Sequence, residues 1–237
     1  MHKIFSFSYF HRAYNIPLKA LIIPLKALTS PLKALIIPLK ALIIAMLSIT
    51  PWQNISANMT EALLDAAKER LNHSVQYDGA YLSIAYPGGD VPDNMGVCTD
   101  VIIRSYRGIG LDLQKLVHED MKTAFNDYPS KRIWELNSTD RNIDHRRVPN
   151  LQTFFKRHGQ KLPVTSNASD YTAGELVTWM LPGNLPHIGI VSDVYDKNSG
   201  HPLIIHNIGS GPQQEDMLFD YPITGHYRFL PENHSNN

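Results

Sequence analysis

Cysteine is the scarcest informative residue in this sequence: Cys98 is the single thiol among 237 residues. One thiol cannot form an internal disulfide, which excludes a fold stapled by disulfide bridges. Two hypotheses then remain for Cys98, an inert side chain of the core or a reactive group. Composition alone favours the inert side chain, so the position of Cys98 in the chain has to decide between them.

The sequence also lacks an excess of positive or negative charge. Lys+Arg and Asp+Glu number 22 each, and the sequence has neither zinc-finger Cys/His spacing nor a basic region that leads into heptads. We therefore expect no nucleic-acid partner. The eleven histidines contain no His-x-His pair, and His118-Glu119 lacks the second histidine of a zincin helix. A metalloenzyme stays an alternative hypothesis, but we predict no metal site and no cofactor.

The N-terminal part repeats a seven-residue unit of the type IPLKALI four times from Ile16. Proline recurs once in each unit, which excludes a coiled coil. After Lys40 the chain has an apolar stretch over residues 41–51 and small residues up to Ala57, a pattern typical of a secretory signal peptide. A membrane anchor is the competing interpretation, but the stretch is shorter than the ~20 apolar residues of a spanning helix. We predict residues 1–57 as an extension with a signal peptide and residues 58–237 as an exported domain.

Hydrophobic periodicity in the exported domain changes from helical to strand-like along the chain. The apolar spacing predicts helices first, over residues 58–71, 98–106, 112–125 and 149–158. One early strand is expected over residues 81–86, and four more over residues 175–180, 187–195, 203–208 and 224–230. Helices followed by an antiparallel sheet predict an α+β fold.

Cys98 follows a glycine-rich loop and begins a predicted helix. The free N–H groups and partial positive charge of a helix N-terminus stabilise a thiolate, so we expect a lowered thiol pKa. His187 begins one predicted strand and His206 lies near the end of the next, so antiparallel pairing brings them together. These residues match the nucleophile, base and orienter of covalent catalysis. Asn207 competes with His206 as the third member. Neighbouring residues of a strand face opposite sides of the sheet, so only one of the two can point into the site.

Several segments resemble ordered motifs of the NlpC-type cell-wall peptidases. The segments are YPGG from Tyr86, GVCT around Cys98, GELV, PHIGI around His187 and the Ile-His pair that ends at His206. This resemblance implies a papain-like fold with N-terminal helices on an antiparallel sheet, and an enzyme that cuts peptide bonds in peptidoglycan. It assigns Cys98 as nucleophile, His187 as general base and then acid, and His206 as orienter. Glu175 stands where aspartate is the commoner residue of the pattern.

A closer resemblance runs from about Ala62 to Leu230. The segments GVCTDVIIRSYR, NIDHRRVPNLQTFF, PHIGIVSD and IIHNIG resemble the bacterial family known as domain of unknown function 1287. The resemblance implies the same papain-like fold without an assigned substrate. Together the two resemblances imply a bacterial periplasmic protein whose partner is a peptidoglycan-type peptide and whose membrane contact is limited to the signal segment.

Three further residues are candidates for substrate binding or oxyanion stabilisation. The backbone N–H of Cys98 is the first oxyanion donor, and the resemblance suggests Tyr86 as a second, with a strand-end core tyrosine as the alternative. Arg146 and Arg147 could hold a substrate carboxylate. Their alternative is an Asp–Arg pair that fixes the loop before the helix over residues 149–158. For Asp100, our first interpretation is a negative charge that complements the helix N-terminus, and the second is a role in the active site.

The function class is therefore a hypothesis with named rivals. A cysteine hydrolase that cleaves amide or peptide bonds accounts for Cys98, His187 and His206 together. An acyltransferase or amidase with another substrate would use the same residues. A non-catalytic binding module on the same scaffold is the rival from another class, because a fold does not establish an activity.

Overall fold

The computed structural model describes residues 51–230, with side chains from residue 58 onward. Its six-stranded antiparallel sheet has the order β3-β8-β4-β5-β6-β7. In chain order the strands are β3 (Gln160–Lys161), β4 (Leu176–Leu181), β5 (Leu185–Tyr195), β6 (Pro202–His206), β7 (Gln213–Glu215) and β8 (Ile223–Arg228). A separate parallel pair joins β1 (Gln76–Tyr77) to β2 (Met95–Gly96). The predicted α+β class is confirmed.

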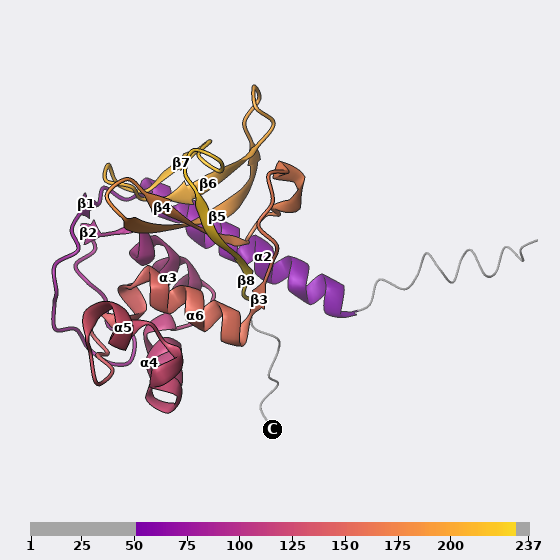
Figure 1. The fold of residues 1–237 in the computed structure, drawn as a ribbon. Helices are drawn as coiled ribbons and strands as arrows, with labels where there is room; N and C mark the ends of the chain where they lie inside the picture. The colour runs from indigo at the N-terminus through magenta and orange to yellow at the C-terminus, as the bar shows by residue number, and fades with distance from the viewer. Residues whose placement is uncertain (1–50, 231–237) are drawn as a thin grey trace, which may run out of the picture. The chain divides into compact units, whose positions relative to one another are not determined.

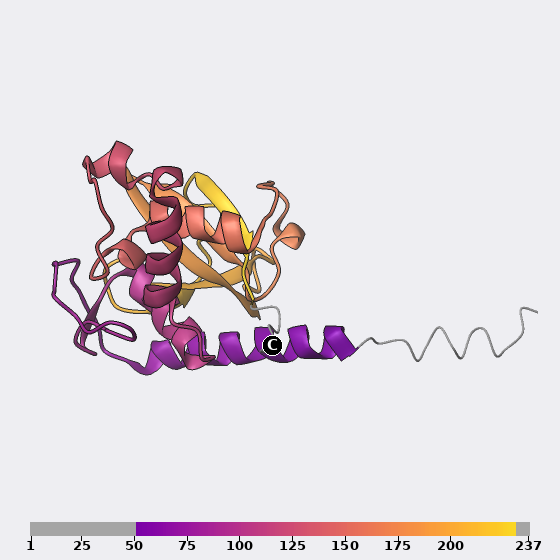
Figure 2. The ribbon, with the colours of Figure 1, turned by 90° about the horizontal axis from the view of Figure 1, so that it is seen from below.

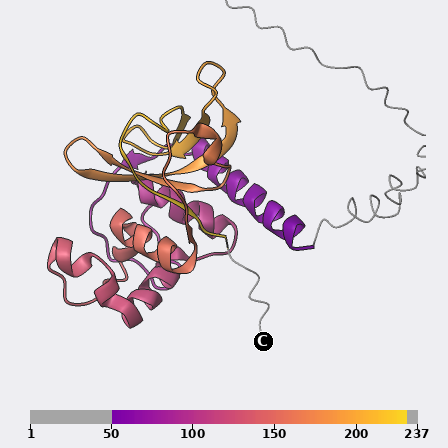
Figure 3. The same cartoon turned by 45° about the vertical axis from the view of Figure 1, so that its right-hand side comes forward.

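The helices precede most of the sheet in the chain and gather on one of its sides (Figure 1). They are α2 (Pro51–Glu69), α3 (Cys98–Gly108), α4 (Leu113–Ala124), α5 (Ser130–Trp134) and α6 (Val148–His158). The short 3-10 turns η1 (Arg70–Asn72), η2 (Phe125–Asp127) and η3 (Asp144–Arg146) lie between these helices, and η4 (Ala168–Asp170) lies between β3 and β4. Figure 3 shows the same separation of helices from strands after a turn of the view, and α3 contacts β5 directly.

Alternate residues of β5 supply two different cores. Ile188 and Ile190 belong to the core between sheet and helices, which includes Cys98. Val191 belongs to a second core on the opposite face of the sheet, with Trp179. Because strand side chains alternate in direction, His187 shares the face of Val191 and pairs across the strands with Trp179. Both faces of the central strands are covered, which buries β5 from His187 to Ser192.

Helix α2 begins at Pro51, seven positions before the expected start at Asn58. Proline is favoured in the first turn of a helix, where its missing N–H has no partner to lose. The seven-residue repeats and Lys40 lie outside the described residues. In Figure 2 α2 lies along the lower side of the domain, and its C-terminal half packs against α3. Within residues 51–230, no helix combines the length and apolarity needed to cross a membrane.

The other expected helices agree with the structure within a few residues. Helix α3 begins at Cys98 as expected, and α6 begins at Val148, one residue before the expected start. Helix α4 is capped by Asp112, whose side chain accepts the N–H of Gln114 at 3.0 Å. A side-chain oxygen at this position satisfies one of the free N–H groups of the first turn.

The strand expected over residues 81–86 is wrong. The segment has the exposure alternation of a strand, yet it pairs with no strand in the described part of the chain. The N–H of Ile84 donates to the side-chain oxygen of Asn142 at 3.1 Å, so a side chain takes the place of a strand partner. The alternating pattern reports burial on one side only and says nothing about a neighbouring backbone.

Candidate active site

Cys98 is the first residue of α3 and is 4% exposed. Its thiol interacts with the backbone N–H of Ile188 in β5 and with the N–H groups of Cys98 and Thr99. The helix N-terminus therefore faces the thiol, as the sequence indicated. Ile188 directly follows His187, so the thiol meets β5 beside the proposed base.

Two buried charges hold the start of α3. The Asp100 carboxylate accepts the N–H of Val97 at 2.7 Å. It also receives two hydrogen bonds from the Arg146 guanidinium, from Nε and Nη2 at 2.9 Å each. The hydroxyl of Thr99 donates to the carbonyl of Arg146 at 3.1 Å. The pair of Asp100 and Arg146 therefore fixes the backbone that carries Cys98, and no substrate is needed to satisfy this arginine.

A cover segment, residues 75–80, passes over the start of α3. Arg146 donates to the carbonyls of Ala80 at 3.2 Å and Asp78 at 3.3 Å, and so attaches this segment to Asp100. Tyr77 lies in the segment, and burial together with neighbouring Cys98 and Asp100 raises its pKa to about 12. The cover segment and the Tyr77 hydroxyl therefore help to bury the thiol.

The two predicted histidines lie together. Nε2 of His187 is 2.9 Å from Nδ1 of His206, and both side chains are buried. Nε2 of His206 is 2.9 Å from Oε1 of Glu215 in β7. Nδ1 of His187 is left without a hydrogen bond among the described residues. No direct hydrogen bond joins Cys98 to His187 there, although the thiol touches the next residue of the strand.

The hydrogen-bond chain assigns one proton arrangement. An ionised carboxylate only accepts, so Glu215 requires a proton on Nε2 of His206. Nδ1 of His206 is then an acceptor, and the Nε2–H group of His187 donates a hydrogen bond to it. Nδ1 of His187 consequently carries a lone pair, the form that a general base needs. Glu215 thus selects the reactive tautomer through two rings.

Gly189 makes the approach of the histidines possible. In the β5–β6 register Ile190 lies opposite Ile205, and the next residues toward the proposed site are Gly189 and His206. A Cβ atom on Gly189 would lie 2.5 Å from Cγ2 of Ile204 and 3.2 Å from Cβ of His206. Only glycine leaves the space that His206 occupies, which explains the His-x-Gly spacing after His187.

Burial determines the protonation states of Cys98, His187 and His206 before a substrate binds. It raises the pKa of the Cys98 thiol to about 12, against the opposing hydrogen bond from Ile188. The expectation of a lowered thiol pKa is therefore wrong for this structure, because desolvation outweighs the helix terminus. Burial and the nearby His206 lower the pKa of His187 to about 3. Burial also lowers the pKa of His206, although Glu215 opposes that change. Thiol and imidazole both rest in neutral form at pH 7.

Two other predicted residues, Tyr86 and Arg147, contact side chains other than that of Cys98. Tyr86 packs edge-on against His118, with ring centroids 5.0 Å apart, and lies under the Arg141 guanidinium. Arg147 pairs with Asp144 at 3.0 Å and covers the ring of Trp134. The contact of Arg147 with Asp144 matches the Asp–Arg pair weighed as its alternative. Tyr86 is only partly buried and lies in no strand, so the alternative of a strand-end core tyrosine is wrong.

Asn207 follows His206 and faces the opposite side of the sheet, toward α3. Its side chain is fully buried, and its Oδ1 accepts the N–H of Gly209 at 3.0 Å. His206, and not Asn207, therefore contacts His187. Across residues 51–230, no group of three His, Cys, Asp or Glu side chains is arranged to hold a metal ion.

Sequence reasoning missed Glu215 and Tyr77. Glu215 becomes visible only when β6 and β7 are paired, since Ile204 opposite Glu215 sets its side chain on the face of His206. The three-residue strand β7 has no hydrophobic pattern to reveal it. Tyr77 lies 21 positions before Cys98 in a segment of two-residue pairing, which leaves no periodic signal either.

Comparison with known proteins agrees with the closer resemblance in the sequence. Residues 64–229 match the family model described as Domain of unknown function (DUF1287). A relative in Escherichia coli (strain K12), "Uncharacterized protein YijF", is 52% identical over 176 residues. The match covers 74% of this chain and 84% of the relative.

Proposed function

This chain belongs to the DUF1287 family, and we propose that it is an exported cysteine hydrolase that cleaves amide bonds in peptidoglycan stem peptides. The observation that carries the proposal is the ordered chain from Glu215 through His206 to His187. It ends in an Nδ1 lone pair on the residue that precedes Ile188, whose N–H interacts with the Cys98 thiol. A merely structural pair of histidines needs no carboxylate to select its tautomer.

The proposed fold is papain-like, in the manner of the NlpC-type peptidases. A nucleophile at the start of a helix packed on the sheet, with base and orienter on neighbouring antiparallel strands, supports this assignment. Export would bring such a domain to the periplasm, where peptidoglycan is the abundant amide polymer.

The reaction begins from the neutral pair. Nδ1 of His187 takes the thiol proton as sulfur bonds to the carbonyl carbon, and the carbonyl electrons move to oxygen. When the carbonyl re-forms, the C–N bond breaks and His187 delivers its proton to the leaving amine. Water, deprotonated by His187, then attacks the thioester and releases the acid together with the Cys98 thiol. Because the Cys98 thiol and His187 are both neutral before attack, the proton must move from sulfur to Nδ1 while sulfur bonds to the carbonyl carbon.

The first test incubates purified muropeptides with the wild-type domain, Cys98→Ala and His187→Ala, and follows the products by mass spectrometry. We expect new amine and carboxyl termini with wild type and none with either variant. The surface variant Asn198→Asp serves as the control for handling and folding. Cleavage by Cys98→Ala would contradict the proposal.

A non-catalytic binding module is the second candidate, and one observation favours it. The thiol is 4% exposed and its pKa is raised to about 12, as expected for an inert core cysteine. On this hypothesis muropeptides bind equally to wild type and Cys98→Ala, and no bond is cut. An acyltransferase would instead transfer the acyl group to an added amine, which the same mass spectra would reveal.

A further inference from the structure

We propose that Asn207 is a further catalytic residue, whose Nδ2 donates a hydrogen bond to the oxyanion formed when Cys98 attacks a carbonyl. The inference rests on the proposed hydrolase function and adds the side-chain donor that Tyr86 does not supply at this position.

The orientation of the Asn207 amide is fixed by chemistry. The N–H of Gly209 can only donate, so the atom 3.0 Å from it is the amide oxygen. Nδ2 must then point the other way. It has no hydrogen-bond partner among the described residues, and the side chain is fully buried. An unsatisfied buried donor costs about 1–3 kcal/mol, so its persistence indicates that a ligand atom completes it.

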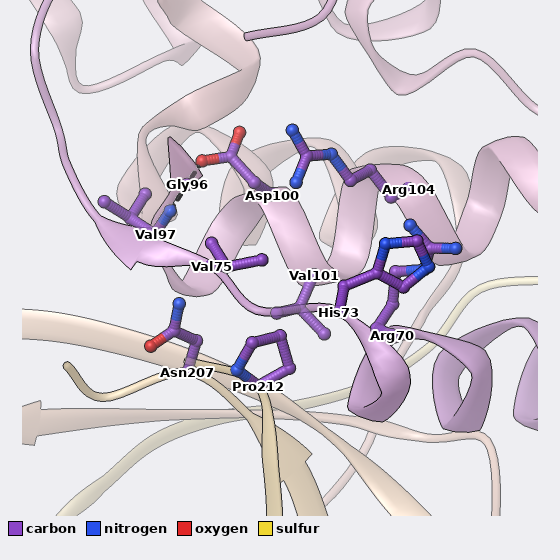
Figure 4. Close-up of a pocket in the computed structure, with 10 residues that line it drawn as sticks. All are labelled: Arg70, His73, Val75, Gly96, Val97, Asp100, Val101, Arg104, Asn207 and Pro212. Atoms are coloured by element: carbon purple, nitrogen blue, oxygen red, sulfur yellow. Dashed lines mark hydrogen bonds between the residues drawn. The ribbon is translucent and has the colours of Figure 1, made fainter. Parts of the chain in front are cut away.

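Nδ2 points into a small cavity against the first turn of α3. Figure 4 shows the amide nitrogen of Asn207 directed toward Val97 across this cavity, which Gly96, Asp100 and Val101 also line. Its volume is about 10 Å³, close to the space for a single water or carbonyl oxygen. The cavity is therefore of a size for one oxygen atom.

The polar lining selects an acceptor. The Asp100 carboxylate is already engaged by Val97 and Arg146. The buried polar atoms of the lining that lack a partner in the described chain are Nδ2 of Asn207 and Nε of Arg70, and both are donors. A ligand atom that only accepts, such as a carbonyl oxygen or oxyanion, satisfies such a lining.

The strand register puts this donor beside the nucleophile. Val97, which directly precedes Cys98, lines the same cavity as Asn207. Extended two residues beyond the Ile190–Ile205 pair, the strand register would bring Asn207 opposite Ile188, whose N–H interacts with the thiol. As sulfur bonds to the carbonyl carbon, the oxygen gains the electron pair. The backbone N–H of Cys98 and Nδ2 of Asn207 then donate to it until the C–N bond breaks. Two donors from different elements define an oxyanion hole.

Two reactions of the same thiol test the proposal. Acetylation of Cys98 by p-nitrophenyl acetate passes through an oxyanion, whereas alkylation by iodoacetamide does not. The ratio of the two rates cancels changes in thiol access and basicity. Both rates are measured by intact-protein mass spectrometry on the folded domain of wild type, Asn207→Ala and Asn207→Asp, with Asn198→Asp as the matched control for an added charge.

We expect the ratio of acetylation to alkylation to fall about 10²- to 10³-fold in both Asn207 variants, the loss typical of one oxyanion donor. Asn207→Asp keeps the acceptor for Gly209 and the side-chain volume, so it isolates the lost donor. A ratio within threefold of wild type, or its recovery in Asn207→Asp, would overturn the proposal and leave Asn207 a loop-holding residue or the ligand of a water. If wild type itself shows no higher ratio than the urea-unfolded chain, the hydrolase function fails as well, and the two failures are thereby distinguished.

Discussion

Nε2 of His187 lies 2.9 Å from Nδ1 of His206, although the two residues are 19 positions apart and on different strands. The contact is diagonal across the strand pair, and Gly189 provides the space for it. Since His206 in turn bonds Glu215, the orientation and the tautomer of His187 depend on residues that never touch the thiol. In the proposed mechanism, Cys98 carries the chemistry, whereas residues of β6 and β7 position His187.

His206→Ala should abolish most hydrolysis, because His187 loses the acceptor that holds a proton on Nε2. We expect muropeptide cleavage to fall by roughly 10⁴-fold, the loss seen when the orienting residue of a catalytic triad is replaced. Glu215→Gln should cost about 10- to 100-fold, as for other outer partners of a histidine. The pH profile should shift with it, because the amide no longer fixes one tautomer.

The control for Glu215→Gln is Asp216→Asn, which removes the same charge from the next residue. Oδ1 of Asp216 lies 3.1 Å from Nδ1 of His201, so its partner is a histidine other than His206. Its variant should keep wild-type cleavage. Equal losses in both variants would mean that general charge, and not the contact with His206, controls the rate.

Acid should destabilise the fold between about pH 6.5 and 5. Burial lowers the pKa of both His187 and His145 to about 3, from a value of 6.5 for an exposed ring. In this window the unfolded chain binds more protons than the folded one, so stability falls as the pH falls. Burial raises the pKa of Asp144 to about 6, which opposes the effect in part because the folded carboxyl then binds the extra proton.

Urea midpoints at pH 7.5, 6 and 5 measure this dependence. His145→Gln should reduce the slope, because one of the buried neutral rings is removed while the proposed site is left intact. A midpoint that is independent of pH in wild type, or an unchanged slope in His145→Gln, would contradict the assignment of these rings as buried and neutral.

Gly189→Ala should lower stability by about 1–3 kcal/mol, the usual range for overpacking a core. The added methyl group would meet Ile204 and His206 at distances that force one of the strands to move. Cleavage should fall with it, since His206 is displaced from His187. Gly79→Ala is the matched control, because its Cβ would lie 3.6 Å from Val97, an ordinary contact. Thermal melts of the two variants decide the point.

The sequence sufficed for those parts of the fold that carry a hydrophobic period. Helices α3, α4 and α6 and strands β4 and β5 are long enough for apolar side chains to recur on a face. The histidine pair was predictable because His187 lies near the start of β5 and His206 ends β6, the next strand of the antiparallel sheet. Residues 81–86 show the limit: an alternating segment forms a strand only when another backbone lies beside it, and here Asn142 takes that place.

The pKa of Cys98 could not be predicted from the sequence either. A helix N-terminus lowers a thiol pKa, but its effect is small compared with full burial. Burial arises from residues distant in the chain, among them Ile188 and Ile190 of the same core. The sequence predicts Cys98 as the nucleophile from its place at the start of a helix but gives no sign of what covers it.

The buried pair of Asp100 and Arg146 should be essential for stability. Asp100→Asn leaves the guanidinium buried without its counter-charge, and loss of one partner of such a pair typically costs about 3–5 kcal/mol. The double variant Asp100→Leu/Arg146→Met removes both charges and should recover part of that loss. Urea unfolding of Asp100→Leu, Arg146→Met and the double variant gives the coupling energy. Purely additive losses would show that the two residues act independently.

Removal of Tyr77 should expose Cys98 while most of the fold is unchanged. Tyr77 is 43% exposed and contributes little to either core, but its hydroxyl and Cys98 are electrostatic neighbours. We expect Tyr77→Ala to speed alkylation of Cys98 by iodoacetamide at pH 7.5, because water and reagent reach the thiol and the desolvation that raises its pKa is relieved. The wild-type thiol should react more slowly than free cysteine.

Tyr81→Ala is the control for Tyr77→Ala. Tyr81 belongs to the same stretch of chain and is 57% exposed, but its hydroxyl accepts a hydrogen bond from Asn142 at 2.7 Å. Its loss should therefore leave the alkylation rate of Cys98 unchanged. If both variants react at the wild-type rate, the cover segment does not limit access to the thiol. Burial would then arise from α3 and β5 alone, and a substrate could reach Cys98 only by separating the helix from the sheet.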